Sequence, residues 1–348
     1  MGKIKIGVWN CYESLNFDNF LFKSSNAPIG DDLLLPLNFL YENGIDNNVF
    51  FNTLPMCEVE DQDAFLFIDF PDMRNSLVKK AFMTNKPKFL IIFESELIKK
   101  ENFDSDNHVL FDKIFTWSDV LIKNNRDKYK KLNFSYDLPR QIARTKKNKL
   151  CTLIAGNKKL NHPLELYSKR IEVIRWFEKN HIEDFDFYGT GWDCYYFTGP
   201  RFVRALNRIK PITRLFASNF PSYKGKIASK KDVLQKYKFS ICFENARDIP
   251  GYITEKIFDC FFAGCVPIYW GANNIEEHIP KNCFIDFTQF SNLDEMYQYI
   301  TNMPDGIYQK YLNDINEFLN GEDCYSYSIE FFSKKINSVI LKELAIEK

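Results

Sequence analysis

Histidine is scarce in this 348-residue chain, and no two cysteines have the CxxC spacing of a zinc site. The four histidines and nine cysteines are scattered, so we expect neither a zinc cluster nor a framework of disulfides. Basic and acidic residues balance at 46 each, which argues against nucleic acid as the main partner. Apolar runs stay well short of the roughly 18 residues that a membrane-spanning helix needs. These absences favour a cytoplasmic protein whose cysteines are small core residues.

Aromatic residues are abundant instead, with 34 Phe and 18 Tyr. Such a load suits large cores and ring-lined pockets for sugars or bases, although most rings will belong to the core. The 45% hydrophobic and 26% charged residues are typical of globular proteins. At 348 residues the chain exceeds what one hydrophobic core usually serves, so we expect two domains.

Apolar runs of strand length alternate with helix-like stretches in the N-terminal half. This alternation predicts βαβ units and a mainly parallel sheet. The expected strands are Ile4–Trp9, Val49–Asn52, Ala64–Phe70, Phe89–Phe93 and Lys113–Trp117. A helix is expected at Asp31–Glu42, ending before Gly44, with Pro36 as an alternative first turn.

A second series of strands and helices follows a basic stretch, Lys123–Lys149, which we interpret as a linker. Its expected strands are Leu150–Ala155, Asp184–Tyr188, Lys238–Phe243, Val266–Trp270 and Phe284–Phe287, and its helices are Pro163–Lys179 and Thr254–Ala263. Two such series predict an α/β protein with two doubly wound domains facing across a cleft, residues 1–145 and 146–325. Residues 326–348 predict an amphipathic helix, which we expect to pack on a domain; a membrane surface is the alternative.

The most informative segment is Lys236–Gly271, KYKFSICFENARDIPGYITEKIFDCFFAGCVPIYWG. A buried strand in it ends at Glu244 and Asn245. This is the edge of an open α/β sheet at which ligands bind.

The helix that follows would place several functional groups in its first turn. Thr254 is a natural N-cap, and the free backbone N–H groups, the helix dipole and Lys256 together form a seat for a diphosphate. Glu255 would accept hydrogen bonds from sugar hydroxyls, and Tyr252 would stack on a ring. A capped helix with solvated charges is the alternative.

FEN, YITEK, a helix closed by AG, and the strand VPIYWG together resemble the donor-binding signature of the α-1,3/α-1,4-fucosyltransferases, glycosyltransferase family 10. YKGKIASK (Tyr223–Lys230) and IPKNCFIDFTQF (Ile279–Phe290) extend the match to about 70 residues. The resemblance implies a GT-B fold of two Rossmann-like domains, with an N-terminal acceptor domain and a C-terminal domain that binds GDP-fucose.

The resemblance also implies roles for residues of the signature. Asn245, Tyr252, Glu255 and Lys256 would line the donor site, with Lys256 neutralising the pyrophosphate and Glu255 holding ribose or fucose hydroxyls.

An arginine on the first helix of the donor domain contacts the diphosphate in this family. Here it corresponds to Arg170, with Lys169 and Arg175 as competitors; from the residues alone, Arg170 is an ordinary exposed helix residue. Lys224 and Lys226 would add to the positive wall of the site.

Transfer with inversion needs a base on the acceptor side. In this family it is a Glu after a strand of the N-terminal domain, which fits Glu94, with Glu96 second. The alternative for either residue is an acid at the start of a helix, with a structural role only.

We interpret the Asp-Gln-Asp at Asp61–Asp63 as a turn before a strand, so no divalent metal or other cofactor is expected to be obligatory. Lys256, Arg170 and the helix dipole would stabilise the departing GDP.

The function implied is inverting transfer of L-fucose from GDP-β-L-fucose to a GlcNAc hydroxyl of an N-acetyllactosamine-type glycan, forming an α-1,3 linkage. Such an acceptor occurs on bacterial surface polysaccharide or lipopolysaccharide. The alternatives are a GT-B enzyme that uses another nucleotide sugar and a glycan-binding module without catalysis. Peripheral membrane contact through the basic linker and the C-terminal helix is a further expectation.

Overall fold

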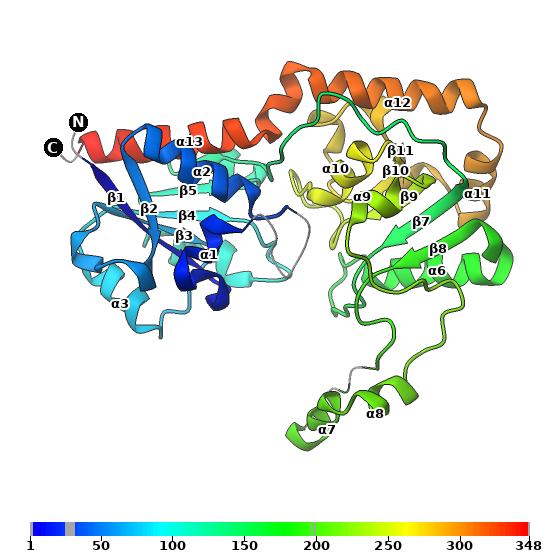
Figure 1. Ribbon diagram of the computed structural model, residues 1–348, viewed down its shortest axis with the longest axis horizontal. Coiled ribbons are helices and arrows are strands. Elements are labelled where there is room, and N and C mark those ends of the chain that lie inside the picture. The colour runs from blue at the N-terminus through cyan, green and yellow to red at the C-terminus, as the bar shows by residue number, and fades with distance from the viewer. Residues whose placement is uncertain (1–2, 25–31, 196, 198–199, 347–348) are drawn as a thin grey trace. The chain divides into compact units, whose positions relative to one another are not determined.

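The computed structural model describes residues 3–24, 32–195, 197 and 200–346. Contacts between Cα atoms divide the chain into two compact units, and each is described here by itself (Figure 1). Unit 1 combines Met1–Leu138 with Ile249–Ile253 and Leu319–Lys348. Unit 2 consists of Pro139–Asp248 and Thr254–Phe318. The C-terminal segment therefore groups with the N-terminal part of the chain.

Unit 1 is built on a six-stranded sheet in the order β2-β1-β3-β4-β5-β6, in which every pairing is parallel. Its strands are β1 (Ile4–Asn10), β2 (Val49–Thr53), β3 (Ala64–Ile68), β4 (Lys88–Ile92), β5 (Lys113–Thr116) and β6 (Tyr129–Lys131). The five expected strands and their parallel arrangement are confirmed. The interpretation of Lys123–Lys149 as a linker was wrong for β6, which lies inside that stretch. β6 is an edge strand whose lysines hid its strand character in the sequence.

The helices of unit 1 are α1 (Phe20–Lys23), α2 (Leu35–Asp46), α3 (Ser76–Met83), α4 (Ser105–His108), α5 (Asp119–Asn124) and α13 (Ile329–Ile346). Pro36 does lie in the first turn of α2, but the predicted end before Gly44 was wrong. Gly44 is buried inside the helix, and a Cβ there would lie 2.6 Å from the carbonyl oxygen of Val49. Gly44 thus permits close approach to β2 and does not end the helix.

The C-terminal helix α13 packs within unit 1. Phe332, Ile336 and Ile340 are fully buried in one core cluster with Leu37 and Leu40 of α2. The two helices run side by side in Figure 1. The expectation that this helix packs on a domain is confirmed, and its apolar face is covered by protein.

Unit 2 is built on a five-stranded sheet in the order β11-β10-β9-β7-β8, also parallel throughout. Its strands are β7 (Lys149–Ile154), β8 (Phe185–Tyr188), β9 (Tyr237–Phe243), β10 (Val266–Trp270) and β11 (Ile285–Asp286). Its helices are α6 (Tyr167–Asn180), α7 (Arg201–Ala205), α8 (Lys210–Leu215), α9 (Lys230–Leu234), α10 (Glu255–Phe262), α11 (Leu293–Thr301) and α12 (Asp305–Asn320). β9 and β10 are buried almost throughout, as central strands covered on both faces are. α6 begins at Tyr167, four residues later than Pro163.

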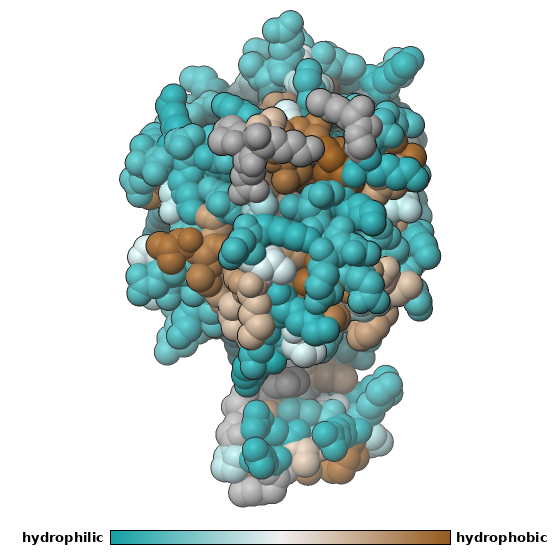
Figure 2. Space-filling view, turned by 90° about the vertical axis from the view of Figure 1, so that its left-hand side faces the viewer, coloured by the Kyte–Doolittle hydropathy of each residue, from teal (hydrophilic) through white to brown (hydrophobic). Residues whose placement is uncertain are grey.

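Figure 2 shows a face on which hydrophobic residues form small groups among hydrophilic ones. Such scattered exposure is normal for a folded domain. Among the described residues, no helix is both long enough and apolar enough to span a bilayer.

Candidate donor site and candidate base

Glu244 lies at the carboxyl end of β9 and is completely buried. One carboxylate oxygen accepts the backbone N–H of Thr254 at 2.8 Å, and the other accepts the Thr254 hydroxyl at 2.7 Å. The ammonium group of Lys256 lies 3.3 Å from the second oxygen. Glu244 therefore fastens the first turn of α10 to the end of β9, although sequence reasoning gave it no role. The position of Glu244 directly after an apolar strand was the feature of the sequence that could have identified it.

Thr254 occupies the N-cap position of α10, as predicted, but its side chain makes no capping hydrogen bond. The buried carboxylate of Glu244 accepts hydrogen bonds from both the hydroxyl and the backbone N–H of Thr254. A negative charge at a helix N-terminus is stabilised by the helix dipole. Glu244 thus binds the N–H of the N-cap residue itself, whereas a capping Thr254 hydroxyl would accept the N–H of Lys256 or Ile257. The Thr254 N–H is therefore not free for a ligand.

Two lysines and two acids continue this cluster on α10 and α9. Lys256 lies 3.4 Å from Glu255, while Lys230 lies 2.7 Å from Asp259 and 3.6 Å from Glu255. Burial alone would raise the pKa of Glu255, but the ammonium groups of Lys256 and Lys230 outweigh it and hold that pKa well below its usual range. Burial alone would lower the pKa of Lys256, but Glu255 and Glu244 raise it.

The charges of this cluster are mostly shielded from water. The side chains of Lys256 and Glu255 are only 21% and 24% exposed, so the alternative of a helix with solvated charges does not hold. A cluster of paired charges at the carboxyl edge of a parallel sheet suits an anionic ligand that competes for the cations.

Arg170 is buried on α6, with 4% of its surface exposed, so the interpretation from the residues alone was wrong. Its guanidinium donates hydrogen bonds to the carbonyl oxygens of Phe243 and Glu244 at 2.6 and 2.8 Å. It lies 3.2 Å from the side-chain oxygen of Asn245. The structure therefore brings Arg170 and Asn245 together at the end of β9.

The two competitors of Arg170 have other partners. Lys169 pairs with Glu172 at 2.6 Å, and Arg175 pairs with Glu178 at the same distance. Both pairs join residues three apart on α6. Glu172 is exposed, whereas the side chain of Glu178 is only 7% exposed.

Tyr252 belongs to unit 1, whereas Thr254 and Lys256 belong to unit 2. Its ring is 2% exposed and lies 4.8 Å from the ring of Trp117, centroid to centroid. The expectation that Tyr252 presents an open face for stacking is therefore wrong for this structure. Its neighbour Gly251 has φ of +82°, and a Cβ there would lie 2.4 Å from the carbonyl oxygen of Trp117.

Lys224 and Lys226 do not belong to the group of charged residues around the first turn of α10 (the α10 cluster). Lys224 pairs with Asp186 of β8 at 3.2 Å, and the strand register places Asp186 level with Ser240, well before Glu244. Lys226 is exposed, and it forms no ion pair within the part of the chain that the structure describes.

In unit 1, Glu94 follows β4 at the carboxyl edge of the sheet, where the sequence predicted it. Tyr12, which follows β1, donates a hydrogen bond from its hydroxyl to Glu94 at 2.7 Å. Glu94 is half-buried, whereas Glu96 is exposed. The hydrogen bond orients the Glu94 carboxylate, and this favours Glu94 over Glu96 as the candidate base.

Asp69, which follows β3, holds the backbone around Glu94. One of its carboxylate oxygens accepts the N–H groups of Phe93 and Glu94 at 2.9 and 3.0 Å and the side-chain amide of Asn102 at 2.6 Å. Burial raises the pKa of Asp69 to about 6, against the lowering effect of these hydrogen bonds. Sequence reasoning missed Asp69 and Tyr12, although both follow buried strands of the same sheet.

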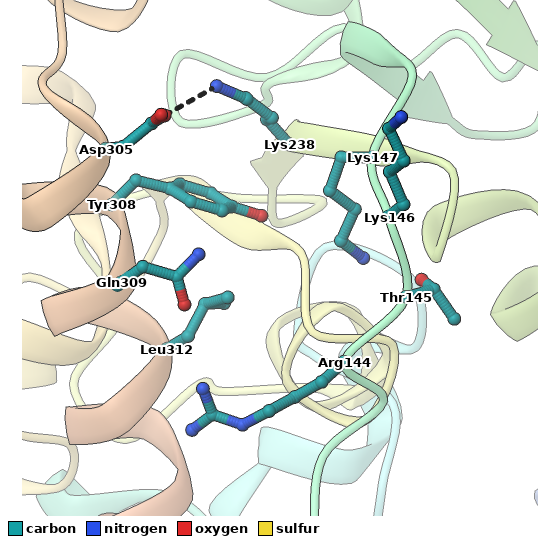
Figure 3. A pocket seen from close by; sticks show the side chains of 9 residues that line it. All are labelled: Arg144, Thr145, Lys146, Lys147, Lys238, Asp305, Tyr308, Gln309 and Leu312. Atoms are coloured by element: carbon teal, nitrogen blue, oxygen red, sulfur yellow. Dashed lines mark hydrogen bonds and ion pairs between the residues drawn. The ribbon is translucent and has the colours of Figure 1, made fainter.

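A shallow pocket of about 330 Å³ lies elsewhere on unit 2 (Figure 3). It is lined by Arg144, Thr145, Lys146, Lys147, Lys238, Asp305, Tyr308, Gln309 and Leu312. Lys147 and Lys238 lie at the amino ends of β7 and β9, whereas Glu244 follows the carboxyl end of β9. This pocket is therefore at the opposite edge of the sheet from the α10 cluster and is not the candidate donor site.

Within the described residues, no group of three or more His, Cys, Asp or Glu side chains is arranged to hold a metal ion. In the Asp-Gln-Asp stretch, Asp61 ends a short 3-10 helix and Asp63 accepts the backbone N–H of Lys5 at 2.8 Å. This stretch is a turn before β3, as predicted.

The family model "Glycosyltransferase family 10 (fucosyltransferase) C-term" matches residues 144–319, which is half of the chain and includes the whole α10 cluster. The chain belongs to glycosyltransferase family 10. Among curated proteins, it is 38% identical over 100 residues to an α-(1,3)-fucosyltransferase of Helicobacter pylori, covering 28% of this chain and 20% of that protein. It is 35% identical over 72 residues to an α-(1,4)-fucosyltransferase of Arabidopsis thaliana, covering 21% of this chain and 18% of that one. The matches thus span about a fifth of the length of these relatives.

Solved structures with the same fold include members of this family and other glycosyltransferases. An α1,3-fucosyltransferase with GDP-fucose superposes with a TM-score of 0.57 at 16% identity, covering 97% of this chain and 90% of the other. A DNA-modifying β-glucosyltransferase superposes with a TM-score of 0.55 at 12% identity, covering 97% and 99%. These likenesses establish the GT-B fold class, as the sequence analysis predicted.

Proposed function

We propose that this family 10 protein is an α-1,3-fucosyltransferase that transfers L-fucose from GDP-β-L-fucose to a GlcNAc hydroxyl of an N-acetyllactosamine-type glycan. The observation that carries the proposal is the cluster of paired charges at the first turn of α10, within the residues that the family model matches. The fucosyltransferase names of the two curated relatives described above support the choice of donor.

Lys256 is the residue we assign to the diphosphate. In the structure its ammonium group is balanced by Glu244 and Glu255 at 3.3 and 3.4 Å. A bound diphosphate would compete for this cation, and Glu255 would be left to accept hydrogen bonds from sugar hydroxyls. Arg170 would act indirectly, by positioning Asn245 and the end of β9. Its guanidinium already donates hydrogen bonds to the carbonyl oxygens at that end of the strand.

Glu94 is the group we assign as the base. A carboxylate suffices, because in a single displacement it takes the proton of the acceptor hydroxyl while the hydroxyl oxygen attacks the anomeric carbon and GDP leaves from the opposite face. The configuration therefore inverts. The hydroxyl of Tyr12 and the backbone contacts of Asp69 would hold the Glu94 carboxylate in place for this step.

Departure of GDP leaves negative charge on the diphosphate. We assign its stabilisation to Lys256 and to the N-terminal dipole of α10, with no obligatory metal. Activity that survives a chelating agent would agree with this assignment, and activity that returns only with a divalent cation would contradict it.

The test is release of GDP by the purified chain given GDP-fucose, with and without N-acetyllactosamine, with the product weighed by mass spectrometry. Acceptor-dependent release with a mass gain of one deoxyhexose is the expected result. Glu94→Gln should lower kcat by about 10²–10⁴-fold with little change in KM for GDP-fucose, because it removes proton transfer only. Lys256→Ala should raise the Kd for GDP.

Matched variants separate these roles from general damage. Glu96→Gln and Lys281→Ala replace exposed residues of the same type and should leave both constants near those of the unaltered chain. Thermal unfolding with GDP-fucose, GDP-mannose and UDP-sugars tests the donor, because a ligand that binds the folded state raises its midpoint. Stabilisation by another sugar nucleotide alone would overturn the choice of donor, and donor binding without any transfer would favour a glycan-binding module.

A further inference from the structure

The segment α7–α8 of unit 2 exposes apolar and basic side chains together. It stands away from the sheet of its own unit in Figure 1, and it forms the lowest part of the view in Figure 2, where hydrophobic and hydrophilic residues lie side by side. Ile209, Leu215 and Phe216 are 46%, 80% and 58% exposed. Leu215 and Phe216 are adjacent in the chain, and large apolar side chains that are exposed next to one another mark surfaces that meet a partner.

The charge of this segment has one sign. It contains five exposed cations and no acid between Pro200 and Phe220: Arg201, Arg204, Arg208, Lys210 and Arg214. None of the five forms an ion pair with any residue that the structure describes. Five such cations on α7, on α8 and on the short 3-10 helix between them (Leu206–Arg208) give a strongly positive local field in a chain of zero net charge.

Contacts within the segment fix its conformation, and in that conformation these side chains are exposed. The backbone N–H of Tyr195 donates to the carbonyl oxygen of Thr213 at 2.7 Å, and the side chain of Asn207 bonds the N–H and the C=O of Phe197 at 2.8 and 2.9 Å. The rings of Phe197 and Phe216 meet edge to face, with centroids 5.6 Å apart. Thr213 and Asn207 therefore turn inward, while Leu215 and the cations face solvent.

We propose that α7–α8 docks on an anionic lipid surface. Cations placed near a negatively charged bilayer are attracted to its headgroups, and apolar side chains beside them enter the boundary between headgroups and acyl chains. A soluble polyanion would use the cations and leave Leu215 and Phe216 in water. A neutral protein surface would use the apolar residues and leave the cations without partners. The lipid surface accounts for both properties. The face of α13 that the sequence offered for this purpose is buried in unit 1.

The experiment is co-sedimentation of the full chain with vesicles of phosphatidylcholine, with and without phosphatidylglycerol, at low and high salt. We expect binding only to the anionic vesicles, weakened by salt because the attraction is screened. Arg204→Gln with Arg208→Gln should weaken binding roughly 30-fold, from about 1 kcal/mol for each cation near the surface. Leu215→Ser with Phe216→Ser should weaken it at both salt concentrations.

Matched variants on unit 1 control for general effects of charge and exposure. Met83→Ser with Val109→Ser changes two apolar side chains that are 81% and 76% exposed. Lys79→Gln with Lys80→Gln removes two exposed cations of α3. Neither pair should change vesicle binding. Equal binding to neutral and anionic vesicles, or an equal loss in these controls, would overturn the proposal.

A footprint on the unaltered chain removes any dependence on how the variants fold. Trypsin should cut at Arg204 and Arg208 in free protein, and anionic vesicles should protect both bonds. Cleavage that vesicles do not slow refutes docking through this segment. Sedimentation velocity tests whether a second copy of the chain occupies this surface instead. If the chain is a dimer that does not bind vesicles, and if Leu215→Ser with Phe216→Ser dissociates that dimer, the surface belongs to the dimer interface and the proposal is overturned.

Discussion

Gly264→Ala should destabilise unit 2, because Gly264 closes α10 in a conformation that alanine does not readily adopt. Gly264 has φ of +60°. Its N–H donates to the carbonyl oxygen of Phe261 and the N–H of Cys265 donates to that of Cys260, which is the Schellman arrangement. A Cβ at Gly264 would lie 1.9 Å from the carbonyl oxygen of Ala143, so one of the two backbones must move.

The expected loss follows from the contacts that would change. The left-handed conformation costs a non-glycine residue about 1–2 kcal/mol. Moving Ala143 also breaks its hydrogen bond to the carbonyl oxygen of Phe262 and strains the bond from Lys147 to that of Ala263, at about 1 kcal/mol each. The free energy of unfolding of unit 2 should therefore fall by roughly 3–4 kcal/mol. GDP binding should weaken as well, because α10 carries Lys256.

The assay is urea unfolding followed by tryptophan fluorescence, with hydrogen exchange of α10 to locate the effect. Gly306→Ala is the matched control. Gly306 lies in the first turn of α12, nothing lies within 4 Å of its added Cβ, and alanine should stabilise the helix by about 0.5 kcal/mol. A Gly264→Ala protein within about 0.5 kcal/mol of the unaltered chain would refute the reasoning, since changes of that size are ordinary for surface substitutions.

Three further predictions concern buried groups. Burial raises the pKa of Asp69 from 3.8 to about 6, so the stability that the protonated carboxyl contributes is complete below pH 3.8 and is lost as the pH rises through 6. Asp69→Asn should flatten the dependence of the free energy of unfolding on pH, measured by denaturation at several pH values. An unchanged pH profile would contradict this prediction. Ile336→Ala should lower the free energy of unfolding of unit 1 by about 3 kcal/mol, because it opens a cavity in the core, while exposed Lys334→Ala should change it little in the same titration. Glu244→Gln should cost unit 2 about 2 kcal/mol through the weakened bond to Lys256, and a variant as stable as the unaltered chain would show that this ion pair contributes nothing.

Much of the fold and part of the site were predictable because they depend on local patterns. Short apolar runs separated by helices predicted both parallel sheets. The rule that carboxyl ends of parallel strands meet at one edge placed Glu94 correctly, and it applies equally to Asp69 and Tyr12, which were overlooked. The family signature marked Glu255 and Lys256, which the structure places in one charged cluster.

The remaining features depend on contacts between residues far apart in the chain. Arg170 looks exposed in a helical pattern, but it is buried because the carbonyl oxygens at the end of β9, more than seventy residues later, accept its hydrogen bonds. Thr254 has the residue type of an N-cap, yet its hydroxyl donates to the carboxylate of Glu244 and makes no capping hydrogen bond. Tyr252 lies in a donor signature but packs on Trp117.

The amino-acid sequence by itself therefore determined the two parallel sheets, the family and the strand ends that carry acidic residues, since these follow from periodicity and from residues adjacent in the chain. Tertiary structure alone decided which charges are buried, which partner each of them has, and that the apolar face of α13 is covered while Leu215 of α8 is exposed. The physical reason is that the pairing and burial of a polar group depend on what surrounds it in space, and a local pattern does not contain that information.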